Sequence, residues 1–528
     1  MPSITKQTVG NNTYLYESHS FRDDEGRPRN RKIKIGKISR ETGRAVYTKE
    51  YINRMHEAGT PLTIIETEKK DRLDGYMNEV FDGLKSYGLF YFLKRISEKI
   101  KLIKILEKSL QKHWEEICML SFYIIASEKP LMYMEDWLEE NASYTVGRMS
   151  SQRISDLLGA FGQKERNDFF KAWCEANTSD EYMALDITSI SSYSKLIQDC
   201  EYGYNRDGEE LKQINLCLLF GEETGLPVYQ TVYSGSLKDV STFKATVSEI
   251  NAVSGGKRLV FVTDKGFYSE KNIKMLVEKY KGSEFLIAVP FVNKWARELV
   301  KEERGKIDKV SNIVKTSGVP IRGTNRKITL SDMHLSAYIL YNPEREVNSR
   351  NNLYAHVAWL KETLENGDQY PDIQEDIDKY LLVKKNNTVE INEKVLDKEL
   401  ETSGWLVMLG NGDLTIQKAH DIYRKKDVVE KAFYKYKNIL GFQRLRVHSD
   451  RRMKNKLFIG FIAMIIVSYI HKVMKEKGLY KKMTMDKLFI TLQKLRKTVI
   501  KGYHILSPIT KEQREVFSAF SIPIPHVG

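Results

Sequence analysis

Residues 181–192 read EYMALDITSISS and residues 258–264 read RLVFVTD, and each stretch predicts a strand that carries one aspartate. The first stretch alternates between two faces, and Asp186 lies on the face opposite Leu185. The second is a continuous apolar run that ends at Asp264, which is typical of a strand buried on both faces. Both carboxylates therefore lie on strands of a predicted sheet.

The two aspartates suggest a metal site if their strands are neighbours. The carboxyl end of a buried strand is where ligands usually bind in α/β sheets. Two adjacent carboxylates repel each other strongly unless a divalent cation lies between them. The alternative for each aspartate alone is a residue that caps a helix or a turn.

The segments around these strands predict a mixed sheet with helices packed on it. Strands are expected at 214–221, 226–235, 285–290 and 404–411, and helices at 241–253 and 269–280. From Val292 to Glu401 the chain is charged and irregular, which indicates an insertion. Before the sheet, residues 66–177 have helical spacing of apolar residues, with helices predicted over 77–99, 115–128 and 150–176. Residues 13–21 and 31–38 predict two strands of a basic hairpin, either a DNA contact or a solvated surface.

One long helix is predicted from Gln417 to Leu440. Tyr423, Glu430 and Lys437 repeat at seven residues and fall within about 40° of one another, and Lys426 lies on the same side. A second stripe is apolar and is expected to dock on the sheet: Val429, Phe433, Tyr436 and Leu440. Glu430 borders that stripe, so it is either the third carboxylate of the site or part of a solvated salt-bridge face.

Three carboxylates suit phosphoryl transfer. Two metal ions can activate an attacking oxygen and stabilise the leaving one, and Mg²⁺ prefers hard oxygen ligands and keeps several waters. We therefore expect two Mg²⁺ ions, for which Mn²⁺ can substitute, with Asp186, Asp264 and Glu430 as catalytic metal ligands. Tyr423, Lys426 and Lys437 would contact flanking phosphates.

The charge of the chain favours a polyanionic partner, either nucleic acid or an acidic membrane, and the alternative is an ordinary basic protein without such a partner. The 528 residues carry a net charge of +14, and 13 Lys or Arg stand against 4 Asp or Glu between residues 417 and 456. A patch of this kind tracks phosphates. The longest apolar run, 457–470, is too short to span a bilayer and has basic flanks, so a buried helix is expected and no membrane partner. The N-terminus shows no secretory signal. Four scattered cysteines suggest neither a zinc site nor a disulfide framework and suit a reducing cytoplasm.

The spacing of Tyr423, Lys426, Glu430 and Lys437 resembles the Tyr-x2-Arg-x3-Glu-x6-Lys signature of bacterial insertion-sequence transposases of the IS-four-like superfamily. The whole chain most resembles their longer IS-sixteen-thirty-four-like branch, through the blocks ALDITSIS, VTDKGFYSEKNI and RVHSDRRMKNKLFIGFIAMIIVSYI. The resemblance is specific over 181–294 and 402–475. One departure is Lys426 in place of the family's arginine, which keeps the charge but loses the bidentate fork.

The resemblance implies an α/β fold with an RNase H-like mixed-sheet catalytic core, interrupted by an α+β insertion and preceded by a mainly helical region. It also implies a DNA transposase that cuts insertion-sequence ends with Mg²⁺ and transfers them to target DNA, as a homodimer in a synaptic complex in the bacterial cytoplasm, nucleoid-associated when bound. Some relatives use insertion-domain aromatics to grip a flipped base, a part that Trp295 or Trp359 could play unless each is a packed core residue.

The chain is thus expected to divide into six regions: a basic β-hairpin region at 1–65, a helical DNA-binding domain at 66–178, the catalytic core at 179–294 and 402–475, the insertion at 295–401, and a basic helical tail at 476–528 with a helix over 485–500. Two other functions stay open: a domesticated relative that binds DNA without cutting it, and a structure-selective nuclease on the same core.

Overall fold

The computed structural model describes two compact units, within residues 3–39, 45–58, 83–127, 129–144, 146–177, 181–254, 260–280, 283–316, 318–366, 373–384, 388–434, 436–437, 440–442, 444–500 and 503–526. Unit 1 comprises Met1–Ser86, Leu495–Pro508 and His526–Gly528, and unit 2 comprises Tyr87–Lys494 and Ile509–Pro525. Each is described by itself.

Unit 1 contains a four-stranded antiparallel sheet in the order β1-β2-β3-β4 and the helix α1. The elements are β1 Ser3–Val9, β2 Asn12–Arg22, β3 Pro28–Ile38, β4 Ala45–Tyr47 and α1 Lys49–Glu57. The small core consists of Leu15 from β2, Ile35 from β3 and Tyr51 from α1. The helix α1 therefore covers the face of the sheet on which Leu15 lies. The two strands predicted for the basic hairpin are confirmed as β2 and β3.

A second sheet of unit 1 corrects two helix predictions. Its order is β18-β17-β5, with β5 Lys85–Ser86, β17 Arg496–Ile500 and β18 Tyr503–Leu506. The helix predicted over 485–500 therefore ends at Gln493, where α18 (Met485–Gln493) stops. The segment beyond it contains Thr498, Val499 and Ile500, whose β-branched side chains favour a strand. The helix predicted over 77–99 begins only at Gly88, and residues 77–82 lie outside the described residues.

The sheet of unit 2 has nine strands in the order β11-β12-β13-β16-β10-β9-β6-β7-β8. The strands are β6 Tyr182–Ser191, β7 Gln213–Gly221, β8 Pro227–Ser234, β9 Val260–Thr263, β10 Glu284–Ala288, β11 Ile313–Val314, β12 Ile321–Leu330, β13 Met333–Tyr341 and β16 Trp405–Gly410. β9 is parallel to both β6 and β10, and the other pairs are antiparallel. The predicted strand order, with α9 (Asp239–Ser254) and α10 (Glu270–Lys279) between the strands, is confirmed, and so is the predicted mixed sheet with helices packed on it.

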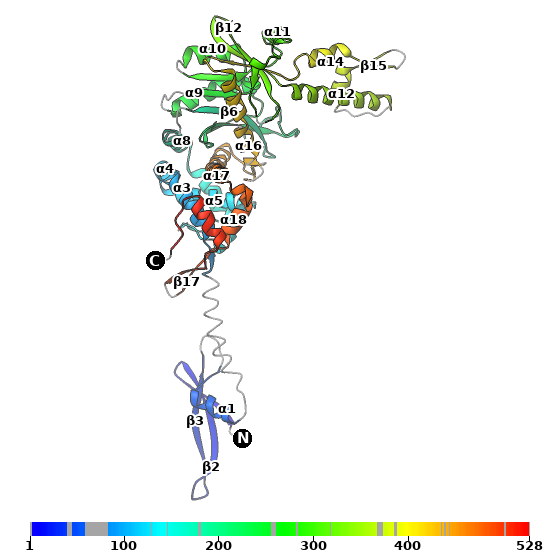
Figure 1. The fold of residues 1–528 in the computed structure, drawn as a ribbon. Helices are drawn as coiled ribbons and strands as arrows, with labels where there is room; N and C mark the ends of the chain where they lie inside the picture. The colour runs from blue at the N-terminus through cyan, green and yellow to red at the C-terminus, as the bar shows by residue number, and fades with distance from the viewer. Residues whose placement is uncertain are drawn as a thin grey trace. The chain divides into compact units, whose positions relative to one another are not determined.

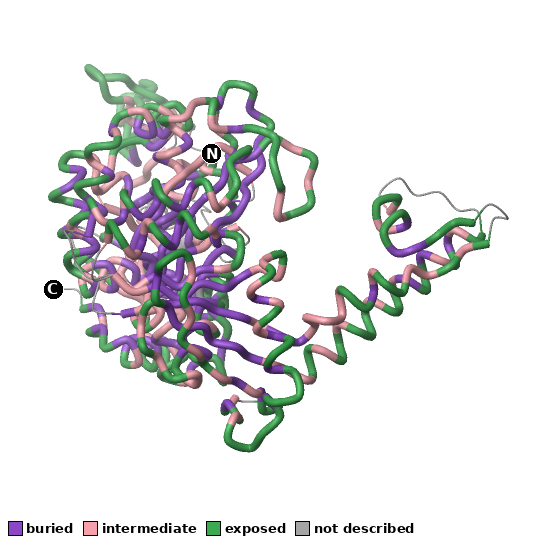
Figure 2. Tube along the Cα trace, turned by 90° about the horizontal axis from the view of Figure 1, so that it is seen from above, coloured by how far each residue is buried: buried purple, intermediate pink, exposed green. Residues whose placement is uncertain are grey.

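The predicted insertion at 295–401 is only in part separate from this sheet. β11, β12 and β13 extend the sheet beyond β16, because β13 pairs with β16 along its length. The part of the insertion from Pro343 to Leu400 projects as an arm on α12 (Pro343–Glu365), as Figures 1 and 2 show. The arm also holds α13 Gln374–Tyr380, β14 Leu381–Val383, β15 Val389–Ile391 and α14 Glu393–Leu400, which share a small core of their own. The pairing of β13 with β16 links residues more than 60 apart, so it could not be predicted from the local sequence.

Helices form the second layer of unit 2. They are α3 Gly88–Lys99, α4 Leu102–Leu110, α5 Trp114–Ala126, α6 Met134–Glu140, α7 Ser151–Ala160, α8 Gln163–Asn177, α17 Asp450–Glu476 and α19 Lys511–Ala519. α11 (Lys294–Glu303) lies instead beside β12, where Glu303 pairs with Arg326 (Figure 1). α17 contacts α5, α7 and β8, so it links the helical layer to the sheet. By length and composition α17 could cross a membrane, with a mean hydropathy of 2.0, but 83% of that window is buried inside the protein. The predicted buried helix is confirmed.

The helix predicted over 417–440 is broken. α15 (Ile416–Lys425) contacts β11, β12 and β13, whereas α16 (Asp427–Tyr434) contacts β6 and β7. At the break the Lys426 amide donates to the Tyr423 carbonyl at 3.2 Å, a tighter turn than that of an α-helix. The apolar stripe that was predicted to dock on the sheet is buried at all four positions: Val429, Phe433, Tyr436 and Leu440.

Candidate active site

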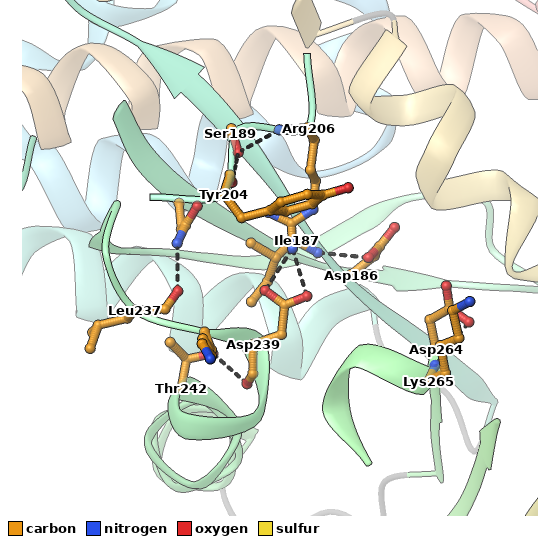
Figure 3. A network of polar contacts seen from close by, with 12 residues as sticks. Asp186, Ile187, Ser189, Tyr204, Arg206, Leu237, Asp239, Thr242, Asp264 and Lys265 are labelled. Atoms are coloured by element: carbon orange, nitrogen blue, oxygen red, sulfur yellow. Dashed lines mark hydrogen bonds and ion pairs between the residues drawn. The ribbon is translucent and has the colours of Figure 1, made fainter. Parts of the chain in front are cut away.

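The two aspartates lie side by side on neighbouring strands. β6 and β9 are parallel with Leu185 opposite Thr263, so Asp186 and Asp264 follow in the next register. The Ile187 amide donates to Asp186 Oδ1 at 2.8 Å, and the Lys265 amide donates to Asp264 Oδ1 at 2.9 Å. Figure 3 shows both carboxylates at this end of the sheet. The strand pairing that the sequence analysis required is therefore present.

The helices α15 and α16 bring three further side chains to the aspartates. The Tyr423 hydroxyl donates to Asp264 Oδ1 at 2.9 Å. Lys426 Nζ donates to Glu430 Oε1 at 3.2 Å and lies 3.9 Å from Asp264 Oδ2. The Lys426 side chain is only 5% exposed, whereas that of Glu430 is 60% exposed. One buried amine thus joins the third acid to the pair on the sheet.

The electrostatics of the site follow from burial and from this amine. Burial raises the pKa of Asp186 to about 6, although the Lys426 charge opposes the rise. Burial would also raise the pKa of Asp264, but the Lys426 amine and the hydrogen bonds from Lys265 and Tyr423 hold it below its usual value. Burial would lower the pKa of Lys426, but the three acids outweigh it and raise that pKa. The site therefore holds a charged lysine among carboxylates.

The donor set fits a hard divalent cation in its chemistry. Asp186, Asp264 and Glu430 supply only oxygen ligands, which Mg²⁺ prefers. Among the described residues, however, no three acidic, His or Cys side chains lie close enough together to hold a metal ion as they stand. The Lys426 amine lies between Glu430 and the aspartates. A metal held by all three acids would have to take over the position of that amine.

Comparisons with known proteins place this geometry in a family. The family model of the transposase DDE domain matches residues 178–466, more than half of the chain. The chain belongs to the DDE transposase family. Among solved structures, this transposase is similar to the cryo-EM structure of a piggyBac transposase synaptic complex with hairpin DNA, at 13% identity and a TM-score of 0.39, over 78% of this chain and 77% of that one. No protein among the curated sequences matches it.

Membership of the DDE transposase family implies both the enzymatic activity and the class of cofactor. DDE transposases cleave DNA and transfer the cut strand, and they use divalent metal ions. The transposase therefore acts in DNA transposition.

The residues predicted to contact DNA have partners within the protein. Tyr423 is bonded to Asp264, and Lys426 is buried against the acids. Lys437 Nζ donates to Asp207 Oδ2 at 2.6 Å, with a side chain only 11% exposed. Of the two tryptophans, Trp295 is part-buried and its Nε1 donates to the Tyr268 hydroxyl at 3.3 Å, as a packed residue would. Trp359 is 46% exposed on the arm, which contradicts the packed role.

The sequence analysis missed an ion pair beside Asp186. Arg206 Nη2 contacts both carboxylate oxygens of Asp239 at 2.6 Å (Figure 3). The Arg206 charge also acts to lower the pKa of Asp186. A Cβ at Gly266 would lie 2.9 Å from Asp239 Oδ2, so glycine permits this approach. Arg206 and Asp239 lie 33 residues apart and form no motif, so only the fold reveals the pair.

The response to pH follows from Asp186. Its folded pKa is raised from 3.8 to about 6. Below pH ~4 the group is protonated in both states. Between pH ~4 and ~6 only the unfolded chain loses the proton, so about 3 kcal/mol of stability is lost as the pH rises.

Because a metal binds the deprotonated carboxylate, we expect the Mg²⁺-induced rise in Tm to grow between pH ~5 and ~7. Asp186→Asn should flatten this dependence. A rise in Tm that is equally large at pH 5 in the unaltered protein would contradict the assignment.

Proposed function

We propose that this transposase performs cut-and-paste movement of a bacterial insertion sequence of the IS-four-like superfamily, in its longer IS-sixteen-thirty-four-like branch. The signature residues Tyr423, Lys426, Glu430 and Lys437 support this subgroup by their spacing. The single observation that carries the proposal is the neighbouring pair Asp186 and Asp264, which Lys426 joins to Glu430.

In this proposal Asp186, Asp264 and Glu430 bind two Mg²⁺ ions, which supply the activation of the attacking oxygen and the stabilisation of the leaving one. The DNA near the cut is oriented by Tyr423, Lys426 and Lys437. For this the DNA phosphates replace the carboxylates that these side chains now contact. The DNA partners are the element's ends and the target duplex, held by a homodimer. The reaction takes place at the nucleoid in the cytoplasm. The four cysteines are buried and form no disulfide, which suits a reducing compartment.

The test is cleavage of a labelled duplex carrying the DNA that flanks this gene. With Mg²⁺ we expect nicking at a defined end, lost in Glu430→Gln because the neutral amide is a poorer ligand than the carboxylate. Tight end binding without any cleavage would support a domesticated binding protein instead. Cleavage without preference for an end would support a structure-selective nuclease.

One face of the sheet in unit 1 supports DNA binding. Lys32 pairs across the strands with Ser18, Lys34 with Tyr16 and Lys37 with Tyr14. Because side chains alternate along a strand, these residues lie on the face opposite Leu15, which α1 does not cover. Lys34 Nζ lies 3.8 Å from the centroid of the Tyr14 ring. Sheets of this kind contact DNA through their exposed side chains.

Replacing all three lysines with glutamine should weaken duplex binding and reduce the slope of log K against log salt by about 3, at ~0.9 for each phosphate that a lysine no longer neutralises. The matched control is Lys6→Gln with Arg31→Gln, whose positions pair with Leu15 and His19 on the other face. Anisotropy titrations at several salt concentrations measure the slope. An unchanged slope would show that these lysines do not contact DNA phosphates and would favour the helical region at 66–178 as the DNA-binding part.

A further inference from the structure

A cavity of about 420 Å³ lies in unit 2, away from the three acids. Its walls come from α5 and the turn that follows it, from α7, from the segment that precedes α17, and from the first turns of α17. The volume is within the range of pockets that hold small organic ligands. None of these lining residues belongs to the site described above, so a ligand in this cavity would be bound separately from the metal ions.

The lining of the cavity divides by chemistry. One part is apolar, and it includes Ile124, Leu131, Met132, Ile154, Leu158 and Phe442. The other part is basic, with Lys129, Arg446, His448, Arg452 and Lys456. Among the described residues that line the cavity, none is acidic. An occupant should therefore carry a flat or apolar body together with an anionic group.

Two of the basic residues, Lys456 and Arg446, are in unfavourable environments: the first is a buried amine and the second has a left-handed backbone conformation. Lys456 Nζ donates to the Leu445 carbonyl at 2.7 Å, and burial, with a further contribution from the Arg446 charge, lowers the pKa of Lys456 to about 8. Arg446 has a φ of +49°, a left-handed conformation that costs free energy for a residue with a Cβ. Two cations are thus held near one another at the cavity with no carboxylate among the charges that act on Lys456. An anion would relieve this repulsion.

The cavity lies within reach of DNA bound at the acids. Arg444 forms an isolated parallel bridge with Ser191, at the end of β6. Ser191 is five residues from Asp186, or about 17 Å along a strand at ~3.3 Å per residue. Arg446 follows Arg444 by two residues, which adds at most about 7 Å. A strand that rises ~3.4 Å per nucleotide spans this distance in about seven nucleotides.

From these observations we propose that the cavity binds one unpaired nucleotide, with the base against the apolar wall and the phosphate at Arg446 and Lys456. Stacking and apolar contact suit any base, and the cations supply the phosphate contact. The proposal rests on the proposed function in one respect, that the chain holds DNA at the acids. The nucleotide belongs to a bound DNA strand or is a free nucleotide, and the experiment separates these sources.

The experiment measures anisotropy with full-length protein in metal-free buffer, so that cleavage plays no part. The probes are a blunt duplex and the same duplex with a short single-stranded tail. For the unaltered protein we expect the tail to tighten binding about tenfold. Arg446→Gln and Met132→Glu should each remove this gain, since Met132 is 59% exposed and tolerates a charge. The control is Lys475→Gln, an exposed lysine in the last turn of α17 that does not line the cavity, and this variant should keep the gain.

The other outcomes have distinct meanings. A gain that persists in both cavity variants overturns the proposal. If the tail gives no gain but deoxyadenosine monophosphate binds saturably, and Arg446→Gln abolishes that binding, the cavity is a free-nucleotide site. If neither the tail nor the nucleotide binds, the proposal is overturned. Failure of the unaltered protein to bind the blunt duplex would count against the proposed function itself.

Discussion

Replacing Asp264 with asparagine should reduce Mg²⁺-dependent cleavage by roughly 10³-fold or more while DNA binding stays within about twofold. Loss of a charged metal ligand costs several kcal/mol of transition-state stabilisation, and each 1.4 kcal/mol is a factor of ten in rate. Asparagine has the same shape and keeps an oxygen that can accept from the Lys265 amide and the Tyr423 hydroxyl. The local structure should therefore survive.

The measurement is single-turnover cleavage of end-bearing duplex, with binding followed separately by anisotropy. Asp397→Asn provides the matched control, because this aspartate is exposed on α14 of the arm and far from β9 in sequence. A variant Asp264→Asn that cuts at the normal rate would show that the site is wrongly assigned.

Replacing Lys426 with glutamine should destabilise the metal-free protein by about 1–3 kcal/mol. Lys426 is buried, but solvent screens part of the charge that its loss leaves behind, because the side chain of Asp264 is 44% exposed and that of Glu430 is 60% exposed. The more buried carboxylate that loses a compensating charge is Asp186. Protonation of Asp186 would relieve part of the cost, so the loss should be smaller at acid pH. Mg²⁺ should restore much of the stability, because the metal supplies the positive charge that the amine no longer provides.

Urea unfolding in chelator and in Mg²⁺ tests this expectation. The charge-preserving control is Lys426→Arg, which should lose little stability in either condition and matches the arginine of the resembling family at this place. Equal destabilisation of Lys426→Gln with and without Mg²⁺ would mean that Lys426 contributes by packing and not by charge.

The catalytic core could be predicted from local pattern. The apolar run before Asp264 and the alternation around Asp186 define two strands, and parallel pairing of β6 with β9 brings their ends together. The burial of the stripe from Val429 to Leu440 could also be predicted, because a helix that is buried on one face has apolar residues spaced by three and four positions. The strands and the helix stripe could be predicted because the burial of each residue depends on its position along the strand or helix, and the resulting pattern of apolar residues is present in the local sequence.

Other features depend on distant partners and were not predicted. β13 has the pattern of a buried strand, but nothing in its residues says that β16 is its neighbour and not a strand of a separate insertion. The break at Lys426 arises where the amine meets acids from β6, β9 and α16. The approach of Arg206 to Asp239 likewise needs the fold. The charged residues of a site are thus easier to identify from the sequence than the residues with which they form ion pairs and hydrogen bonds.

The most direct test of the central claim is a structure of the transposase bound to an end-bearing duplex with Mn²⁺, whose anomalous scattering locates the metal. We predict metal peaks bound by Asp186, Asp264 and Glu430, with the Lys426 amine moved from its place between them and turned to a DNA phosphate. Peaks bound elsewhere, or acids that still contact Lys426 with no metal beside them, would contradict the account.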